Sequence, residues 1–173
     1  MTDIRMFYAH ADRVITTWMA RHGITLLRLS IGVVFLWFGA LKYFPGMSPA
    51  ETLATRTIND LTFGVIQPEA ARYILASLET LIGLGLLAGV FLRAVIFLLF
   101  FQMAGTFTPI FLYPAEVFKV FPYAPTLEGQ YIIKNLVIIS AALVIGATVR
   151  GGALVAEPEA AKKAVTEEDA KNN

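Results

Sequence analysis

The 173-residue chain has the length of a single domain, but 57% of its residues are hydrophobic and only 16% are charged, which is too apolar for an ordinary soluble domain. Its net charge of +1, with Lys and Arg spread along the chain, argues against the basic surface that nucleic-acid binding requires. The sequence has no Cys, which excludes disulfides, iron–sulfur clusters on protein thiolates and a dithiol relay within the chain. We therefore predict an all-α integral membrane protein.

The N-terminal segment, residues 1–23, has apolar residues at three- and four-residue steps with charged residues between them. This pattern predicts an amphipathic helix that lies in the membrane interface on the cytoplasmic side and ends at Gly23. The alternative is a soluble helix that packs on another part of the protein.

Four apolar stretches follow, each long enough to cross a hydrocarbon core of about 30 Å at about 1.5 Å per residue. They predict a four-helix bundle over residues 24–150, in which Thr126 is the N-cap of the last helix and Glu128 lies in its first turn. The final residues, 151–173, are expected to form a mobile charged tail. The predicted spans cover about 24–44, 73–92, 93–113 and 131–149.

The two long joining segments, 45–72 and 114–130, fall on the same side of the membrane if the spans alternate. In the first, Ser48, Pro49 and Glu51 predict the N-cap, the first residue and the capping-box partner of a short surface helix. The second is rich in proline and aromatic residues, which favours an ordered lid or an interfacial anchor. Because Lys and Arg concentrate in the short connections and the tails, both termini are expected in the cytoplasm.

Charged residues within the predicted spans are the strongest functional signal, because an ionised side chain in hydrocarbon costs several kcal/mol even after snorkelling. Glu79 lies about two turns from the outer end of its helix. We expect it to pair with Lys134 or Lys42 in an outward-opening interior, where small residues let the helices approach closely. The predicted ligand-binding or buried polar cluster comprises Lys42, Glu79, Gln102, Thr106, Thr108, Lys134 and Asn135.

A purely structural interpretation of these residues stays open. Lys42 and Arg28 are then snorkelling anchors at the two membrane interfaces, and a Glu/Lys pair only fixes helix register. Pro109 is expected to leave the carbonyl of Gly105 without its helical partner. The sequence assigns no catalytic residue, and it assigns no metal site because the two histidines lie in the N-terminal segment without clustered carboxylates.

The stretches LLRLSIGVVFLWFGALKYFPG, LETLIGLGLL, QMAGTFTP and GQYIIKNLVIISAALVIGA resemble the DoxX-like superfamily, in particular its YkgB-like branch of bacterial inner-membrane proteins. The resemblance covers about residues 26–147 and implies a multi-pass protein of the bacterial inner membrane. Some members are associated with thiosulfate oxidation coupled to membrane quinone, and others with defence against oxidants. The residues that carry the resemblance best are Arg28, Gly32, Gly39, Lys42, Glu79, Gly83, Thr108, Pro109 and Lys134.

The resemblance favours a component of oxidant or sulfur-redox defence that binds a quinone head group or a small anion in an outward-facing polar pocket. Quinone is the one cofactor that we consider. Whether the chain is itself an enzyme stays open, since it has no self-sufficient catalytic motif. The alternatives are a non-catalytic scaffold or assembly subunit for a partner oxidoreductase, and a small-solute transporter or channel. The expected partners are the lipid bilayer, with an oxidoreductase or further copies of this chain as open alternatives.

Overall fold

The computed structural model describes residues 2–157, 159 and 162–163, and nearly all of its regular structure is helical. Within these residues, four segments are long and apolar enough to cross a membrane, when α4 and α5 are counted as one segment from Leu92 to Leu112. The predicted four-helix membrane bundle is therefore confirmed at the level of fold class. The elements are α1 (Thr2–Leu41), α2 (Glu51–Leu61), α3 (Pro68–Ala88), α4 (Leu92–Phe107), α5 (Pro109–Leu112), α6 (Pro114–Val117), β1 (Phe118–Val120), β2 (Ala124–Pro125) and α7 (Leu127–Ala147).

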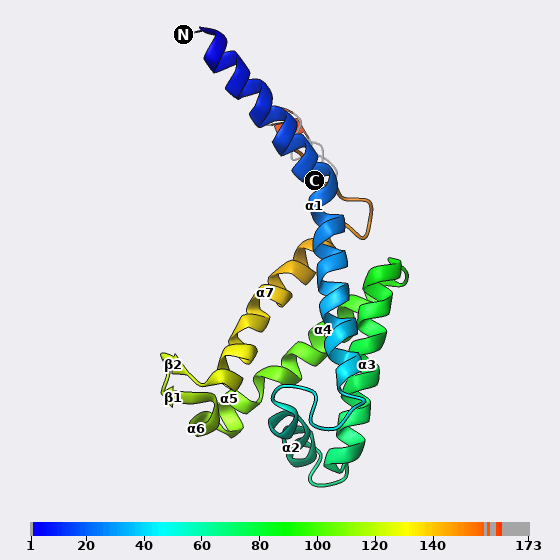
Figure 1. Cartoon of the computed structure of the whole chain (residues 1–173). Helices are drawn as coiled ribbons and strands as arrows, with labels where there is room; N and C mark the ends of the chain where they lie inside the picture. The colour runs from blue at the N-terminus through cyan, green and yellow to red at the C-terminus, as the bar shows by residue number, and fades with distance from the viewer. Residues whose placement is uncertain (1, 158, 160–161, 164–173) are drawn as a thin grey trace, which may run out of the picture.

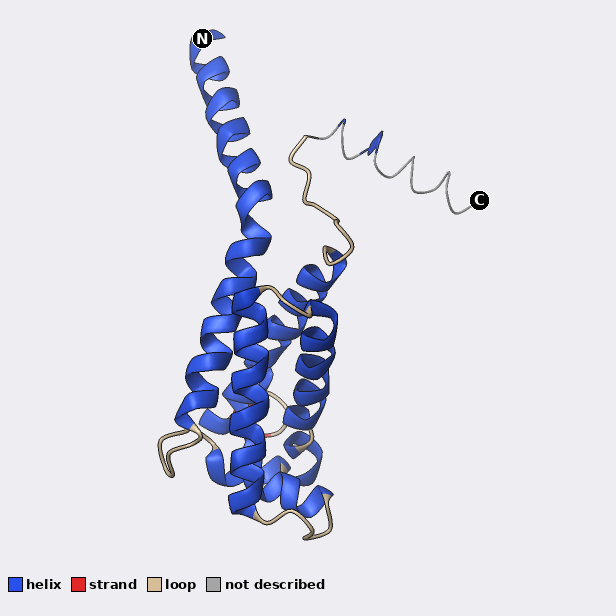
Figure 2. Ribbon diagram, turned by 90° about the vertical axis from the view of Figure 1, so that its right-hand side faces the viewer, coloured by secondary structure: helices blue, strands red, loops and turns tan. Residues whose placement is uncertain are grey.

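The long helices run side by side, and the short elements gather at one end of the bundle (Figures 1 and 2). We call this end the loop end; the opposite end, beyond which the N-terminal part of α1 extends, is the terminal end (Figure 1). A hydrophobic core joins α1, α3, α4 and α7, and a second, smaller core lies at the loop end. Buried members of the first core include Phe35, Ile82, Leu86, Leu99 and Ile145, and those of the second are Leu53, Val117, Phe118 and Ile132.

Glycines hold α1 and α3 at backbone contact distance. A Cβ added to Gly39 would lie 2.7 Å from the backbone nitrogen of Thr80, and one added to Gly83 would overlap the backbone of Leu36. In a membrane, where lipid tails are as apolar as Leu, such close packing is a main source of helix association. The structure thus agrees with the expected close approach on the faces that carry small residues.

The predicted helix end at Gly23 is wrong, because α1 continues through this residue without a break. Glycine costs about 1 kcal/mol relative to alanine inside a helix, which is too little to end one by itself. Its backbone also lacks the left-handed conformation that ends α3 at Gly89, where φ is 71°. At about 1.5 Å per residue, the 40 residues of α1 extend over about 60 Å. The interfacial position of residues 1–23 remains a prediction.

The short helix of the first long loop is confirmed as α2, but its predicted capping box is wrong. The helix begins at Glu51 and follows Ala50, whose φ is 54°, and no side chain caps its first turn. The Glu51 carboxylate instead accepts a hydrogen bond from the backbone N–H of Gly46 (3.0 Å) and lies 3.8 Å from Arg72 Nε. These contacts draw Glu51 away from the position that a capping box requires.

At the last span the predicted cap is confirmed, since Thr126 Oγ1 accepts a hydrogen bond from the N–H of Gly129 (3.1 Å). The helix begins at Leu127, as this cap requires, so its first turn precedes the apolar span predicted from residue 131, and α3 likewise begins at Pro68, before the predicted residue 73. Polar residues in these first turns hide them from a hydropathy pattern. The β1–β2 hairpin was not predicted. Of the predicted mobile tail, residues 158, 160–161 and 164–173 lie outside the described residues.

The Gly83 contact gives a direct test of the α1–α3 packing. We expect Gly83→Ala to lower the free energy of unfolding by about 1–3 kcal/mol, because its Cβ would force two backbones apart. Gly105→Ala is the matched control, since no atom lies within 4 Å of a Cβ there. Thermal unfolding of both variants in detergent measures the difference. Equal stability of the two variants would contradict the packing described here.

Candidate functional site

Three side chains from different parts of the chain meet inside the bundle near the loop end. Lys42 Nζ lies 2.6 Å from Glu79 Oε2, and Gln102 Nε2 donates a hydrogen bond to Glu79 Oε1 at 2.5 Å. Lys42 follows the last residue of α1, Glu79 belongs to α3 and Gln102 to α4. The Lys42 and Glu79 side chains are only 13% and 11% exposed. We call these three residues the polar triad.

The partner of Glu79 is therefore Lys42 and not Lys134, which decides between the two predicted pairs. The close approach at Gly39, one turn before Lys42, brings the end of α1 against Glu79. A buried charge persists only when it is paired and hydrogen-bonded, and here both carboxylate oxygens have donors. The interpretation of Lys42 as a snorkelling anchor is wrong for the same reason.

Two buried polar atoms in or next to the polar triad have no hydrogen-bond partner among the described residues. One is Gln102 Oε1, the acceptor atom of the side chain that donates to Glu79. The other is the hydroxyl of Thr80, the residue after Glu79. Leaving such a group unsatisfied costs about 1–3 kcal/mol. The triad therefore keeps the capacity to accept a hydrogen bond from a bound molecule.

Two arginines stabilise the α1–α3 pair at its opposite ends. Arg72 of α3 donates from Nη1 to the carbonyl oxygens of Lys42 (3.1 Å) and Tyr43 (3.0 Å), directly after α1 ends. Arg28 of α1 donates from Nη1 to the carbonyl of Leu87 (3.2 Å) near the end of α3. Each guanidinium thus satisfies carbonyls that a helix end leaves without partners. Arg28 thus has partners on α3, and its position relative to the membrane surface remains a prediction.

The predicted threonines serve the backbone of the α4–α5 segment. Thr106 Oγ1 donates to the carbonyl of Gln102 (2.9 Å). Thr108 donates to the carbonyl of Gly105 twice, from its hydroxyl (2.6 Å) and from its backbone N–H (3.2 Å). Thr108 therefore supplies donors to the Gly105 carbonyl in place of the backbone N–H that Pro109 lacks. Neither hydroxyl is bonded to the carboxylate of the triad.

Lys134 and Asn135 do not join the polar triad. Both lie in α7, about two turns after its start; Lys134 is exposed and Asn135 is half-buried. Neither side chain forms a hydrogen bond or an ion pair with any residue of the described chain. The structure thus brings together three of the seven predicted site residues: Lys42, Glu79 and Gln102.

Four residues that the sequence analysis missed fasten the two long loops to each other at the loop end. Arg56 Nη2 lies 2.5 Å from Glu116 Oε1, and its guanidinium carbon lies 3.9 Å from the centre of the Tyr113 ring. The Tyr113 hydroxyl donates to Asp60. The bond to Glu116 raises the pKa of Arg56, and the bond to Asp60 raises the pKa of Tyr113. No local pattern signals contacts between residues so distant in sequence.

A comparison with protein families adds an independent finding. The model of the DoxX family matches residues 23–114, slightly more than half of the chain. The chain belongs to the DoxX family. The match includes the whole polar triad and both capping arginines but ends before α7, so it says nothing about Lys134. Neither a curated protein nor a solved structure matches the chain.

A double-mutant cycle tests the coupling within the polar triad. We expect Lys42→Met to destabilise the folded protein by about 3–5 kcal/mol, because it leaves the Glu79 carboxylate buried without its cation. Adding Glu79→Leu to that variant should recover most of the loss. Lys134→Met, at an exposed lysine, is the control and should have a small effect. Additive effects at the two triad positions in urea or thermal unfolding would refute the coupling.

Proposed function

We propose that the polar triad binds the head group of a membrane quinone or quinol, as part of oxidant or sulfur-redox defence in the bacterial inner membrane. The observation that carries the proposal is the buried Gln102 Oε1, an acceptor without a donor beside an ion pair. Buried polar atoms normally have partners in folded proteins, so an unpartnered one at a charged site marks a place for a ligand. The redox setting is the one that the family resemblance implies.

The residues of the triad fit the oxygen atoms of such a head group. A quinol hydroxyl can donate to Gln102 Oε1, which no described residue occupies. The Lys42 ammonium has three N–H donors, and one of them serves Glu79, so others are left for a quinone or quinol oxygen. A quinol can therefore donate a hydrogen bond from one ring oxygen to Gln102 and accept one from Lys42 at the other.

The proposal limits this chain to binding and orienting the head group. With no Cys in the sequence, the chain has no thiol relay, so we propose that electrons pass to a partner oxidoreductase. The arginines of the terminal end, Arg21, Arg93 and Arg150, favour a cytoplasmic position for that end. The triad then belongs to the outward-facing half of the bundle, near the loop end.

Binding of a soluble short-tail quinol tests this function. Decylubiquinol should bind saturably to the protein in lipid nanodiscs, and Glu79→Gln and Gln102→Leu should each weaken binding by roughly tenfold or more, the loss of about one strong hydrogen bond. Lys134→Met is the matched control and should bind like the wild type. Each variant is first compared with the wild type by thermal unfolding. Unchanged affinity in folded triad variants would refute the proposal.

A non-catalytic scaffold is the second candidate, and the saturated ion pair favours it. Both oxygens of Glu79 already have donors within the protein, as expected of a pair that only fixes helix register. On this proposal the chain holds a partner oxidoreductase through its cytoplasmic tail.

Crosslinking in native membranes tests the scaffold role of the tail. If the chain is a scaffold, deletion of residues 152–173 should remove one defined crosslinked oxidoreductase, while the melting temperature of the bundle stays unchanged. Glu79→Gln should then leave that crosslink intact. A deletion variant that keeps the crosslink would exclude this role for the tail.

A further inference from the structure

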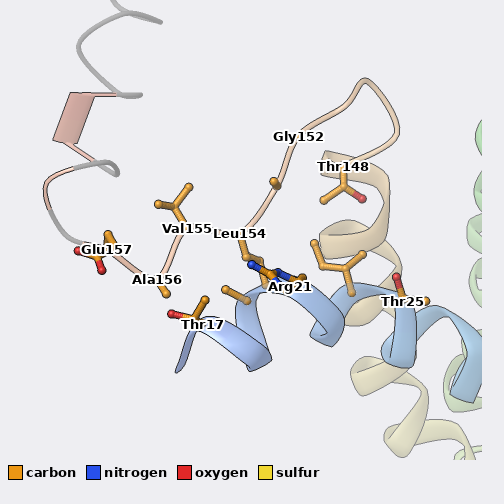
Figure 3. Close-up of a pocket in the computed structure, with 12 residues that line it drawn as sticks. Thr17, Arg21, Thr25, Thr148, Gly152, Leu154, Val155, Ala156 and Glu157 are labelled. Carbon is orange, nitrogen blue, oxygen red and sulfur yellow. The ribbon is translucent and has the colours of Figure 1, made fainter. Parts of the chain in front are cut away.

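A groove at the terminal end lies far from the polar triad and takes no part in the function proposed above. It lies between α1 and the segment that follows α7, has a volume of about 570 Å³, and is open on one side (Figure 3). Residues 17–25 of α1 form one wall. Residues 152–157, which we call the strap, form the other wall together with Thr148.

Polar side chains of α1 share the face that lines this groove. Thr17, Arg21 and Thr25 are spaced by four residues, so they lie one above the other on the helix. None of the three side chains has a hydrogen bond or ion pair with another residue of the described chain. In Figure 3, Arg21 points from α1 toward the strap. A guanidinium flanked by two free hydroxyl groups is suited to the oxygens of a phosphate.

The remaining lining and the neighbouring charges narrow the choice of ligand. Ile24, Leu154 and Val155 add apolar surface to the groove, which a free phosphate ion would not use. Arg13 already pairs with Glu157 of the strap at 2.6 Å, so its charge is compensated. Arg21 therefore lines the groove without an ion-pair partner among the described residues and is available to an anionic ligand.

The position of the groove along α1 corresponds to the head groups of a bilayer. Arg21 precedes Leu41, the last residue of α1, by twenty residues, or about 30 Å of helix, which is the thickness of the hydrocarbon core. Trp18 is 54% exposed, and its ring stacks on His22 with centroids 5.0 Å apart. Exposed tryptophans of this kind gather at the interface between hydrocarbon and water.

We propose that this groove binds the head group of an anionic phospholipid, with Arg21 on the phosphate and Thr17 and Thr25 as additional hydrogen-bonding groups. The strap covers the head group from the other side, and the apolar residues of the groove contact the first part of an acyl chain. The ion pair between Arg13 and Glu157 holds the strap only weakly, because both side chains are largely exposed. The groove can therefore open to admit a lipid from the membrane.

Native mass spectrometry of the full chain with added phosphatidylglycerol or phosphatidylcholine tests this site. The wild type should retain phosphatidylglycerol in preference to phosphatidylcholine, and Arg21→Gln should reduce the retained fraction by roughly tenfold. Arg93→Gln is the matched control, because Arg93 is an exposed arginine at the same end of the bundle that does not line the groove. This control should retain the lipid like the wild type.

Further variants and competition identify the source of the phosphate group. The melting temperature of Arg21→Gln should match that of the wild type, so that a loss of retention reports on the site and not on folding. An equal loss in Arg93→Gln would indicate general attraction to basic residues and would overturn the site. Displacement of the lipid by millimolar inorganic phosphate, or retention unchanged in Arg21→Gln, would overturn it as well.

Discussion

A charged side chain within the membrane must meet its partner at contact distance. This constraint sets the separation of α1 and α3, and the other helices of the bundle pack around this pair. Gly39 and Gly83 bring the two backbones together, and only at that separation can Lys42 lie 2.6 Å from Glu79. Arg28 and Arg72 then satisfy the carbonyls at the two helix ends from the opposite helix. Helix α4 adds the amide that occupies the second oxygen of Glu79, and α7 packs on α1 and α4 to complete the core.

The two ends of the bundle differ in the way they are held, and this difference separates the proposed functions. The loop end is tightly packed, because its short elements share a hydrophobic core and the Arg56–Glu116 and Tyr113–Asp60 contacts join two loops. The terminal end is open, and one exposed ion pair holds the strap there. A recognition site for a redox head group suits the ordered end, whereas exchange with lipid suits the open one.

Local signals in the sequence were sufficient for some features and not for others. Hydropathy located the four spans, small residues marked the close-packed faces, and the Thr126 cap followed from residues within one turn. The choice between Lys42 and Lys134 was open because the position of a residue along its own helix does not reveal which helices are neighbours. The failed capping box has the same origin, since Glu51 is drawn to Arg72, a residue of another helix. The helix end predicted at Gly23 was wrong because a glycine inside a helix lowers its stability only slightly and does not end it.

The unbroken course of α1 has a mechanical consequence. The helix has no proline and no break between Arg21 and its last residue, so it behaves as a stiff rod across the hydrocarbon core. One end of this rod adjoins Lys42, which is tied to α3, and the other carries Arg21 of the proposed lipid site. When bilayer thickness changes, tilting is one way in which such a helix adapts. Because Gly39 and Gly83 hold α1 against α3 at backbone contact distance, the two helices should tilt together, and the lysine–glutamate contact then keeps its geometry when the membrane around it changes.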